Sequence, residues 1–219
     1  VDPEYLGRYA SPDSTSIPIG IEIRQSLLFW KEAPLKDVIV MQYDIHNKSD
    51  HVLDRSFIHL LTWPVIRRSR QSARDTMGYS FFFPEPSRSL GYVYNPGLAA
   101  GSASSPHLGI GLLEMPKDTN GNTIGMTRWS QEVTKANIAG PHTDVGRYDS
   151  MYATYRDTSR RAIVGLNVPI YWSTLAGSSG FRIQPGDSAR FVVALMVGNG
   201  LSDLLRIHDL VRRVYANNY

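Results

Sequence analysis

The sequence predicts a mainly β fold, a two-layer antiparallel β-sandwich with long loops and one amphipathic helix at the C-terminal end. Three observations predict it. In Asp37–His46, and again in residues 188–198, apolar residues recur at every second position, which is the period of a β-strand. After Gly200 the spacing of apolar residues lengthens to that of a helix.

The stretch 188–198 is the best defined of these elements. Both of its faces are apolar, so we expect a central strand that is covered on both sides. Pro185-Gly186-Asp187 predicts a turn just before it, because Pro presets φ and Gly accepts a positive φ. We interpret Phe181–Ile183 as a short partner strand across that turn.

The first half of the chain predicts further strands. Ile17–Trp30 is the first strand region, and Asp37–His46 is the second. The turn cluster Asn47–Asp50 predicts a hairpin between the second strand and Leu53–Thr62. Other strands are expected at Met77–Phe83, Leu90–Tyr94, His107–Met115 and Ala162–Tyr171, with a loop at Ser173–Ser179.

Two glycines and one serine predict details of packing. Gly109 and Gly111 lie within an expected strand, which indicates that a neighbouring element packs closely against it. Apolar residues recur at helical spacing in Ser202–Ala216, with Ser202 as the expected N-cap and Asp203 in the first turn.

The chain is expected to form one domain over residues 17–219, preceded by an arm at 1–16. The polar stretch 117–161 has weak periodicity and is too long for an ordinary loop. Long insertions in compact domains usually serve function or assembly, so we expect this one to do so.

Composition excludes several classes of function. The chain has 219 residues and no cysteine, which excludes disulfides and thiolate metal sites. Its net charge is only +3, with 23 basic residues scattered among 20 acidic ones, so we expect no nucleic-acid partner. No run approaches the roughly 20 apolar residues of a membrane helix, so we expect no membrane span.

Three stretches together resemble a β-sandwich domain found in large secreted or surface proteins of Bacteroidetes-like bacteria, often exported by the type IX route. Asp37–Ser49 resembles the family's D-D-F-V-I-x-E-Y-x-I-x-N-x-S hairpin, and Leu108–Pro116 resembles its strand ending in L-x-x-P. Phe181–Gly200 and its helix resemble the closing G-P-F-x-L-x-P-G-D-x-x-x-V-x-x-A-x-V-x-G-x-G pattern. The resemblance implies an extracellular or cell-surface structural module without enzymatic activity.

One segment departs from that family. Its members tend to follow the third strand with acidic residues that could bind cations. Here the segment Trp63–Asp75 is basic instead, with Arg67, Arg68 and Arg70 at its centre. These arginines could bind phosphate or an acidic polysaccharide, or they could face solvent or the acids of a neighbouring chain.

Metal binding has two candidates in the sequence. Asp118, Asn120 and Asn122 place oxygen ligands at alternate positions, as a calcium loop does, although a hairpin turn at Asn120-Gly121 explains them equally well. His46 and His51 flank a turn among aspartates, where a zinc site could form, but we interpret them as polar turn residues. Beyond calcium, no cofactor is expected.

Aromatic residues are the one enriched class, and they crowd the middle of the chain. Such rings suit contact with another protein chain, stacking on sugars, or internal packing. His59, His107 and His208 are expected to be packed or hydrogen-bonded. The aromatic candidates for partner or sugar contact are Trp63, Trp129, Tyr148, Tyr152 and Tyr155, with Trp172 a further candidate for sugar.

No motif of a known catalytic chemistry is present, so no catalytic residue is predicted. The leading hypothesis is a non-enzymatic extracellular structural or interaction module, a subunit of a surface assembly or filament. Its partners would be other protein chains, including further copies of itself. The alternative is a carbohydrate-binding module that uses exposed aromatic residues on a polysaccharide.

Overall fold

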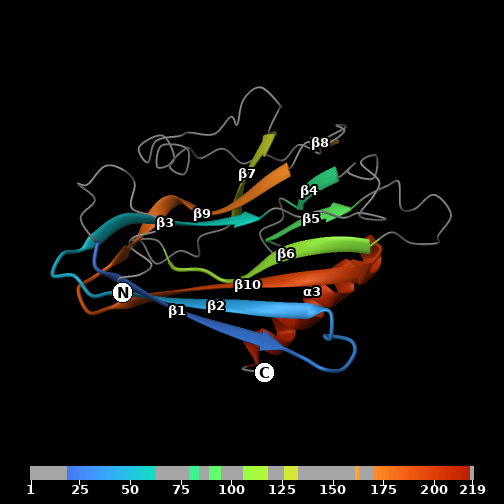
Figure 1. The fold of residues 1–219 in the computed structure, drawn as a ribbon, viewed down its shortest axis with the longest axis horizontal. Helices are drawn as coiled ribbons and strands as arrows, with labels where there is room; N and C mark the ends of the chain where they lie inside the picture. The colour runs from blue at the N-terminus through green and yellow to red at the C-terminus, as the bar shows by residue number, and fades with distance from the viewer. Residues whose placement is uncertain are drawn as a thin grey trace, which may run out of the picture.

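The computed structural model confirms the predicted fold class. Its strands form two antiparallel sheets, and one helix follows at the C-terminal end (Figure 1). The sheets are open and sandwich-like. The structure describes residues 19–62, 79–83, 89–94, 106–117, 126–132, 161–162 and 170–217.

The larger sheet has seven strands in the order β1-β2-β10-β6-β5-β4-β8. Its central strand, β10, pairs antiparallel with β2 on one side and β6 on the other, as the two apolar faces of 188–198 predicted. The strands of this sheet are β1 (Ile21–Phe29), β2 (Val38–Asn47), β4 (Tyr79–Phe83), β5 (Leu90–Tyr94), β6 (Pro106–Glu114), β8 (Arg161–Ala162) and β10 (Ser188–Asn199).

The smaller sheet has three strands in the order β3-β9-β7. They are β3 (Leu53–Thr62), β7 (Met126–Glu132) and β9 (Ile170–Ile183). β7 lies inside the stretch 117–161 that we predicted as an insertion without clear periodicity, and it pairs with β9 along its whole length. The predicted arm at 1–16 lies outside the described residues.

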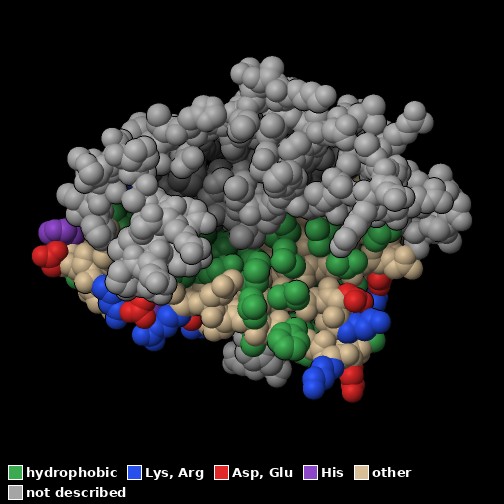
Figure 2. All heavy atoms as spheres, viewed as in Figure 1, with side chains coloured by type: hydrophobic (Ala, Val, Ile, Leu, Met, Phe, Trp, Pro, Cys, Tyr) green, Lys and Arg blue, Asp and Glu red, His purple; other side chains and the backbone are tan. Residues whose placement is uncertain are grey.

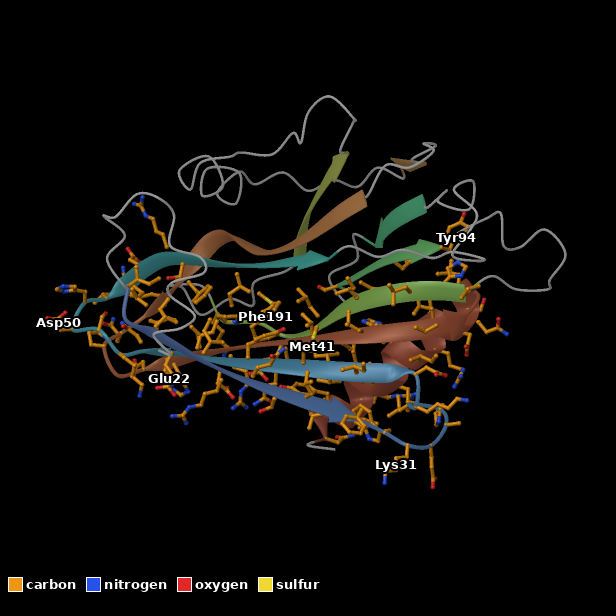
Figure 3. The ribbon with its side chains drawn as sticks, viewed as in Figure 1. Glu22, Lys31, Met41, Asp50, Tyr94 and Phe191 are labelled. Atoms are coloured by element: carbon orange, nitrogen blue, oxygen red, sulfur yellow. The ribbon has the colours of Figure 1, made fainter. Side chains whose placement is uncertain are left out.

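Two hydrophobic cores lie on opposite faces of the larger sheet. Val192, Ala194 and Met196 of β10 face the helix α3 (Leu201–Ala216) and pack in one core. Phe191 and Val193 of the same strand face the smaller sheet and pack in the other. This confirms the assignment of alternate residues of β10 to two covered faces. Figure 3 shows Phe191 and Met41 in the space between the sheets.

The glycines of β6 let the helix approach its strand, as predicted. A Cβ at Gly109 would lie 2.9 Å from Cδ1 of Leu204, and one at Gly111 would lie 2.7 Å from Cδ2 of His208. Leu204 and His208 are fully buried on the inward face of α3. A side chain at either position would force the facing side chain of the helix to move.

The start of the helix differs from the prediction. It begins at Leu201 with Gly200 as N-cap, so the assignment of Ser202 as N-cap was wrong. Gly200 has a φ of 91°, which turns the chain sharply off β10. The carboxylate of Asp203 accepts the N–H of Asn199 at 2.9 Å and thereby ties the first turn of the helix to the end of β10.

Three connections also differ from the prediction. β3 does not form a hairpin with β2, because it pairs with β9 in the smaller sheet. Phe181–Ile183 is the end of β9 and does not pair with β10. Ser173–Ser179, predicted as a loop, lies within β9. In the first two cases a short turn carries the chain from one sheet to the other, and local spacing does not distinguish such a crossing from a hairpin.

Both crossings meet at Asn47, which is fully buried. Its side-chain NH₂ donates to the carbonyl oxygens of His51 at 2.7 Å and Ile183 at 3.0 Å. Its side-chain oxygen accepts from the backbone N–H and the hydroxyl of Ser49. Its backbone C=O accepts from Gly186, in the second crossing. Asn47 therefore joins the 48–52 and 184–187 turns, and each of its side-chain donors and acceptors has a partner.

Candidate interaction surface

The strand β1 has two faces of different chemistry. Its even-numbered residues share the helix side of the sheet, because Leu28 packs against the helix core. Its odd-numbered residues point to the other side, because Ile21 packs against the core between the sheets. This alternation follows from the two-residue period of a strand. The odd-numbered residues are Ile21, Ile23, Gln25, Leu27 and Phe29, and none of them is charged.

The smaller sheet covers only part of that side. On this side of β1, β2 and β10, five large apolar residues remain between 44% and 69% exposed. Phe29 is the most exposed of them. We call these five residues the apolar patch. Figure 2 shows hydrophobic side chains gathered over β1 and β2 on this face. The apolar patch consists of Ile23, Leu27 and Phe29 of β1, Ile39 of β2 and Val197 of β10.

The patch is contiguous because its strands are neighbours. Phe29 lies opposite Ile39, and Ile39 lies opposite Leu195 of β10, so these three residues form a row across the sheet. Ile23, Leu27 and Phe29 form a column along β1. Single exposed apolar residues are normal on soluble proteins, whereas large contiguous apolar patches are typical of contact surfaces.

β1 also forms one edge of the larger sheet. Among the described strands it pairs with β2 alone, so the N–H and C=O groups of alternate residues along this nine-residue strand face outward. Its register with β2 runs from Ile21 to Phe29 without a shift, and it contains neither proline nor lysine. Proteins usually protect edge strands with such residues or with bulges. Within the described residues, the edge of β1 has no proline, lysine or bulge, and its only charged residues are Glu22 and Arg24.

The helix side of the same strands carries ion pairs instead. Arg24 lies 2.6 Å from Glu22, and Lys48 lies 3.5 Å from the same carboxylate. Arg190 of β10 donates to Asp44 of β2 at 2.6 Å. Figure 3 labels Glu22 near the start of β1. Charge is therefore confined to one side of β1 and β2, and the side that holds the apolar patch is uncharged along β1.

The Asp44–Arg190 pair shows how these charges are balanced. Partial burial raises the pKa of Asp44. The hydrogen bonds from Gln42 and Arg190 together outweigh burial, so the pKa of Asp44 lies below its ordinary value. The pKa of Arg190 is raised by the same hydrogen bond. Beside this pair, the hydroxyl of Tyr215 donates to Glu114 and ties the end of α3 to β6. The first pair therefore joins two strands of the sheet, and the second joins the helix to the sheet.

A second surface feature lies on the outer side of α3. An open hollow there is lined by Arg206, Asp209, Arg212, Arg213 and Ala216. Arg206 is 2.7 Å from Asp203 on the same helix. The lining arginines are exposed.

The predicted metal candidates are not brought together as a site. Asp44 and Asp54 contact Arg190 and Arg182 respectively, and His51 lies beside the exposed Asp50. Within the described residues, no three His, Asp or Glu side chains are grouped as metal ligands. Asp118, Asn120 and Asn122 lie outside those residues, so calcium binding there stays a prediction.

The predicted contact residues also fall largely outside the described part of the chain. Trp129 lies in β7 opposite Ser173, and Trp172 lies in β9, but the structure does not describe either side chain. Sequence analysis missed the apolar patch, although the alternation of Ile19, Ile21 and Ile23 was visible. The residues outside the description are Trp63, Arg67, Arg68, Arg70, Tyr148, Tyr152 and Tyr155.

Two of the three lone histidines are packed, as expected. His107 is 8% exposed and stacks on Tyr94, with ring centroids 4.6 Å apart. His208 is fully buried under β6, with its Nδ1 3.6 Å from Asp209. The side chain of His59 is outside the description.

Comparison with known proteins does not extend these observations. No protein-family model matches the chain, and no curated protein matches it. Within the described residues, no helix has the length and hydropathy needed to cross a membrane.

Proposed function

We propose that this chain is a non-enzymatic structural and interaction module that acts by binding other protein chains. The observation that carries the proposal is the apolar patch at the edge strand β1. A folded domain gains nothing by leaving Phe29 and Ile23 more than half exposed unless a partner covers them. A location outside the cell or at its surface is part of the proposal and rests on the resemblance of the strand motifs.

The chemistry of the patch favours a protein partner. A nucleic acid would need cations for its phosphates, and the odd-numbered residues of β1 supply none. A protein partner needs an apolar centre with a polar rim, and it gains further from a strand edge with which its backbone can pair. Here the patch provides the centre, and Gln25 and Tyr43, joined by a 3.0 Å hydrogen bond, lie beside it.

Photo-crosslinking in the producing cells tests this proposal. Benzoylphenylalanine is placed at Phe29, in the patch, and in a matched chain at Arg206, which is exposed on the outer side of α3. Mass spectrometry then identifies what each position captures. We expect Phe29 to give one or a few discrete protein adducts that are absent from the Arg206 chain. The same adducts from both positions, or none from Phe29, would contradict the proposal.

A further inference from the structure

We propose that a partner of this surface is a second copy of the same chain, bound through the outer edge of β1. The two β1 strands pair antiparallel around a two-fold axis at Gln25 and join the two seven-stranded sheets into one. This inference rests on the proposed function, because it names the occupant of the same surface. The outer edge of β1 and the order of residues along β1 support it.

The edge is suited to strand addition. β1 has nine residues in continuous register with β2, and among the described strands nothing pairs with its other side. Its unprotected backbone groups offer roughly one hydrogen bond per residue to an added strand. An added strand gains those bonds without any rearrangement of β1, which β2 already holds extended.

The sequence of β1 is complementary to itself in this arrangement. With Gln25 on the axis, Ile23 lies opposite the partner's Leu27, and Ile21 lies opposite the partner's Phe29. Directly opposite residues in antiparallel strands have Cβ atoms about 4.5–5.5 Å apart, so these apolar pairs are in contact. Both belong to the uncharged side of the strand.

The charged side tolerates the same register. Glu22 lies opposite the partner's Leu28, and Arg24 lies opposite the partner's Ser26, so no like charges face each other. A shift that centres the axis on Arg24 would place the two guanidinium groups opposite each other. The register centred on Gln25 is also the one that pairs all nine residues of β1, from Ile21 with the partner's Phe29 to Phe29 with the partner's Ile21.

A closed two-fold pair is the form that this edge allows. Antiparallel pairing of one strand with itself is isologous, so each copy uses its only described free β1 edge and no further copy can add there. The result is a dimer through β1. Any longer assembly would need a second, different contact.

The absence of cysteine from the chain makes the register directly testable. In Gln25→Cys the two sulfurs meet at the axis, because Cα atoms about 4.5–5.5 Å apart suit a disulfide. We expect most of the purified chain to form a disulfide-linked dimer under mild oxidation. Arg212→Cys, exposed on the helix at the opposite side of the sheet, is the matched control and should remain monomeric at the same concentration.

Sedimentation of the cysteine-free chain tests the energetics. Leu27→Lys puts a charge opposite the partner's Ile23 and should weaken self-association at least tenfold. Ile39→Lys alters the same apolar patch on β2, away from the edge, and should leave self-association unchanged. Equal loss in both variants would instead indicate packing of one patch face against another and would overturn edge pairing.

The outcomes separate this inference from the proposed function. A wild-type chain that stays monomeric at its highest soluble concentration, or Gln25→Cys that crosslinks no faster than Arg212→Cys, overturns self-pairing. If Phe29 then still captures a different protein in cells, binding of protein chains stands and only the identity of the partner was wrong. If Phe29 captures nothing either, both proposals fail.

Discussion

The two sides of the seven-stranded sheet are covered in different ways. On the helix side, α3 packs so closely on β10 and β6 that Val192, Ala194 and Leu204 are fully buried. On the other side, the three-stranded sheet buries Phe191 but leaves Phe29, two strands away, 69% exposed. The comparison teaches that α3 covers one side of the central strands closely, whereas the smaller sheet leaves apolar side chains of β1 exposed on the other.

The largest expected effect on stability is that of replacing Phe191. Phe29, on the same side of the sheet, provides the comparison. Phe191 is 2% exposed and packs against Tyr43 with ring centroids 5.9 Å apart. Phe191→Ala should lower the free energy of unfolding by about 4 kcal/mol, from lost burial and the cavity left behind. Urea titration followed by circular dichroism measures it.

Phe29→Ala is the matched control for that change. Because Phe29 is mostly exposed, its loss should change the free energy of unfolding of the monomer by less than about 0.5 kcal/mol. Equal destabilisation by the two substitutions would show that Phe29 is covered within one chain, and the comparison between the two regions would be wrong.

The next largest effect concerns Asn47, which joins the 48–52 and 184–187 turns. Asn47→Ala should lower the free energy of unfolding by about 3 kcal/mol, because the carbonyls of His51 and Ile183 and the groups of Ser49 lose buried partners. Ser49→Ala removes only a hydroxyl near the surface and should cost about 1 kcal/mol. The same urea titration distinguishes them, and similar costs would mean that Asn47 is not the junction.

A substitution on β6 tests how closely α3 packs on the sheet. Gly111→Ala adds a Cβ 2.7 Å from the buried ring of His208, and should cost about 2 kcal/mol as the helix shifts outward. Gly186→Ala adds a Cβ into open space at a φ of 81°, so its cost of about 1 kcal/mol is conformational only. Crystal structures or amide exchange should show displacement of α3 in the first variant alone.

The smallest effect concerns Asp203, in the first turn of α3. Backbone bonding to Asn199, followed by the side chain of Arg206, holds the pKa of Asp203 below its ordinary value of 3.8. The carboxylate therefore adds stability that is complete above that value and is lost as the pH falls through the lower folded pKa. Asp203→Ala should cost about 1 kcal/mol at pH 7.

The pH dependence of that cost separates charge from packing. The difference between Asp203→Ala and the wild type should shrink when unfolding is measured in strong acid, because the wild-type carboxyl is then protonated. A difference that stays constant from neutral pH into strong acid would mean that the side chain acts through its volume and not through its charge.

Much of the fold could be predicted from local spacing. Alternation assigned β2 and β10 and divided the residues of β10 between two buried faces. Gly109 and Gly111 correctly indicated a close neighbour on β6. Such features depend on a few consecutive residues, whose period fixes the direction of each side chain.

The pairing of strands could not be predicted in the same way. The turns at 48–52 and 184–187 have the composition of hairpin turns, yet each crosses between sheets. The two crossings are joined by the hydrogen bond from Asn47 to the carbonyl of Ile183, 136 residues further along the chain. Exposure of the apolar patch is also non-local, because it depends on how far the smaller sheet extends and not on β1 itself.

The position of β10 has a consequence for how the molecule is made. It lies inside the larger sheet, flanked by β2 and β6, but among the described strands of that sheet it is the last to be synthesised. Until residues 188–199 emerge, the hairpin of β1 with β2 and the strands beyond β6 have no common neighbour, so their apolar surfaces stay apart and open to other molecules. Completion of the sheet therefore waits until β10 has been made, and a chain without residues 188–199 would lose the strand that pairs with both β2 and β6.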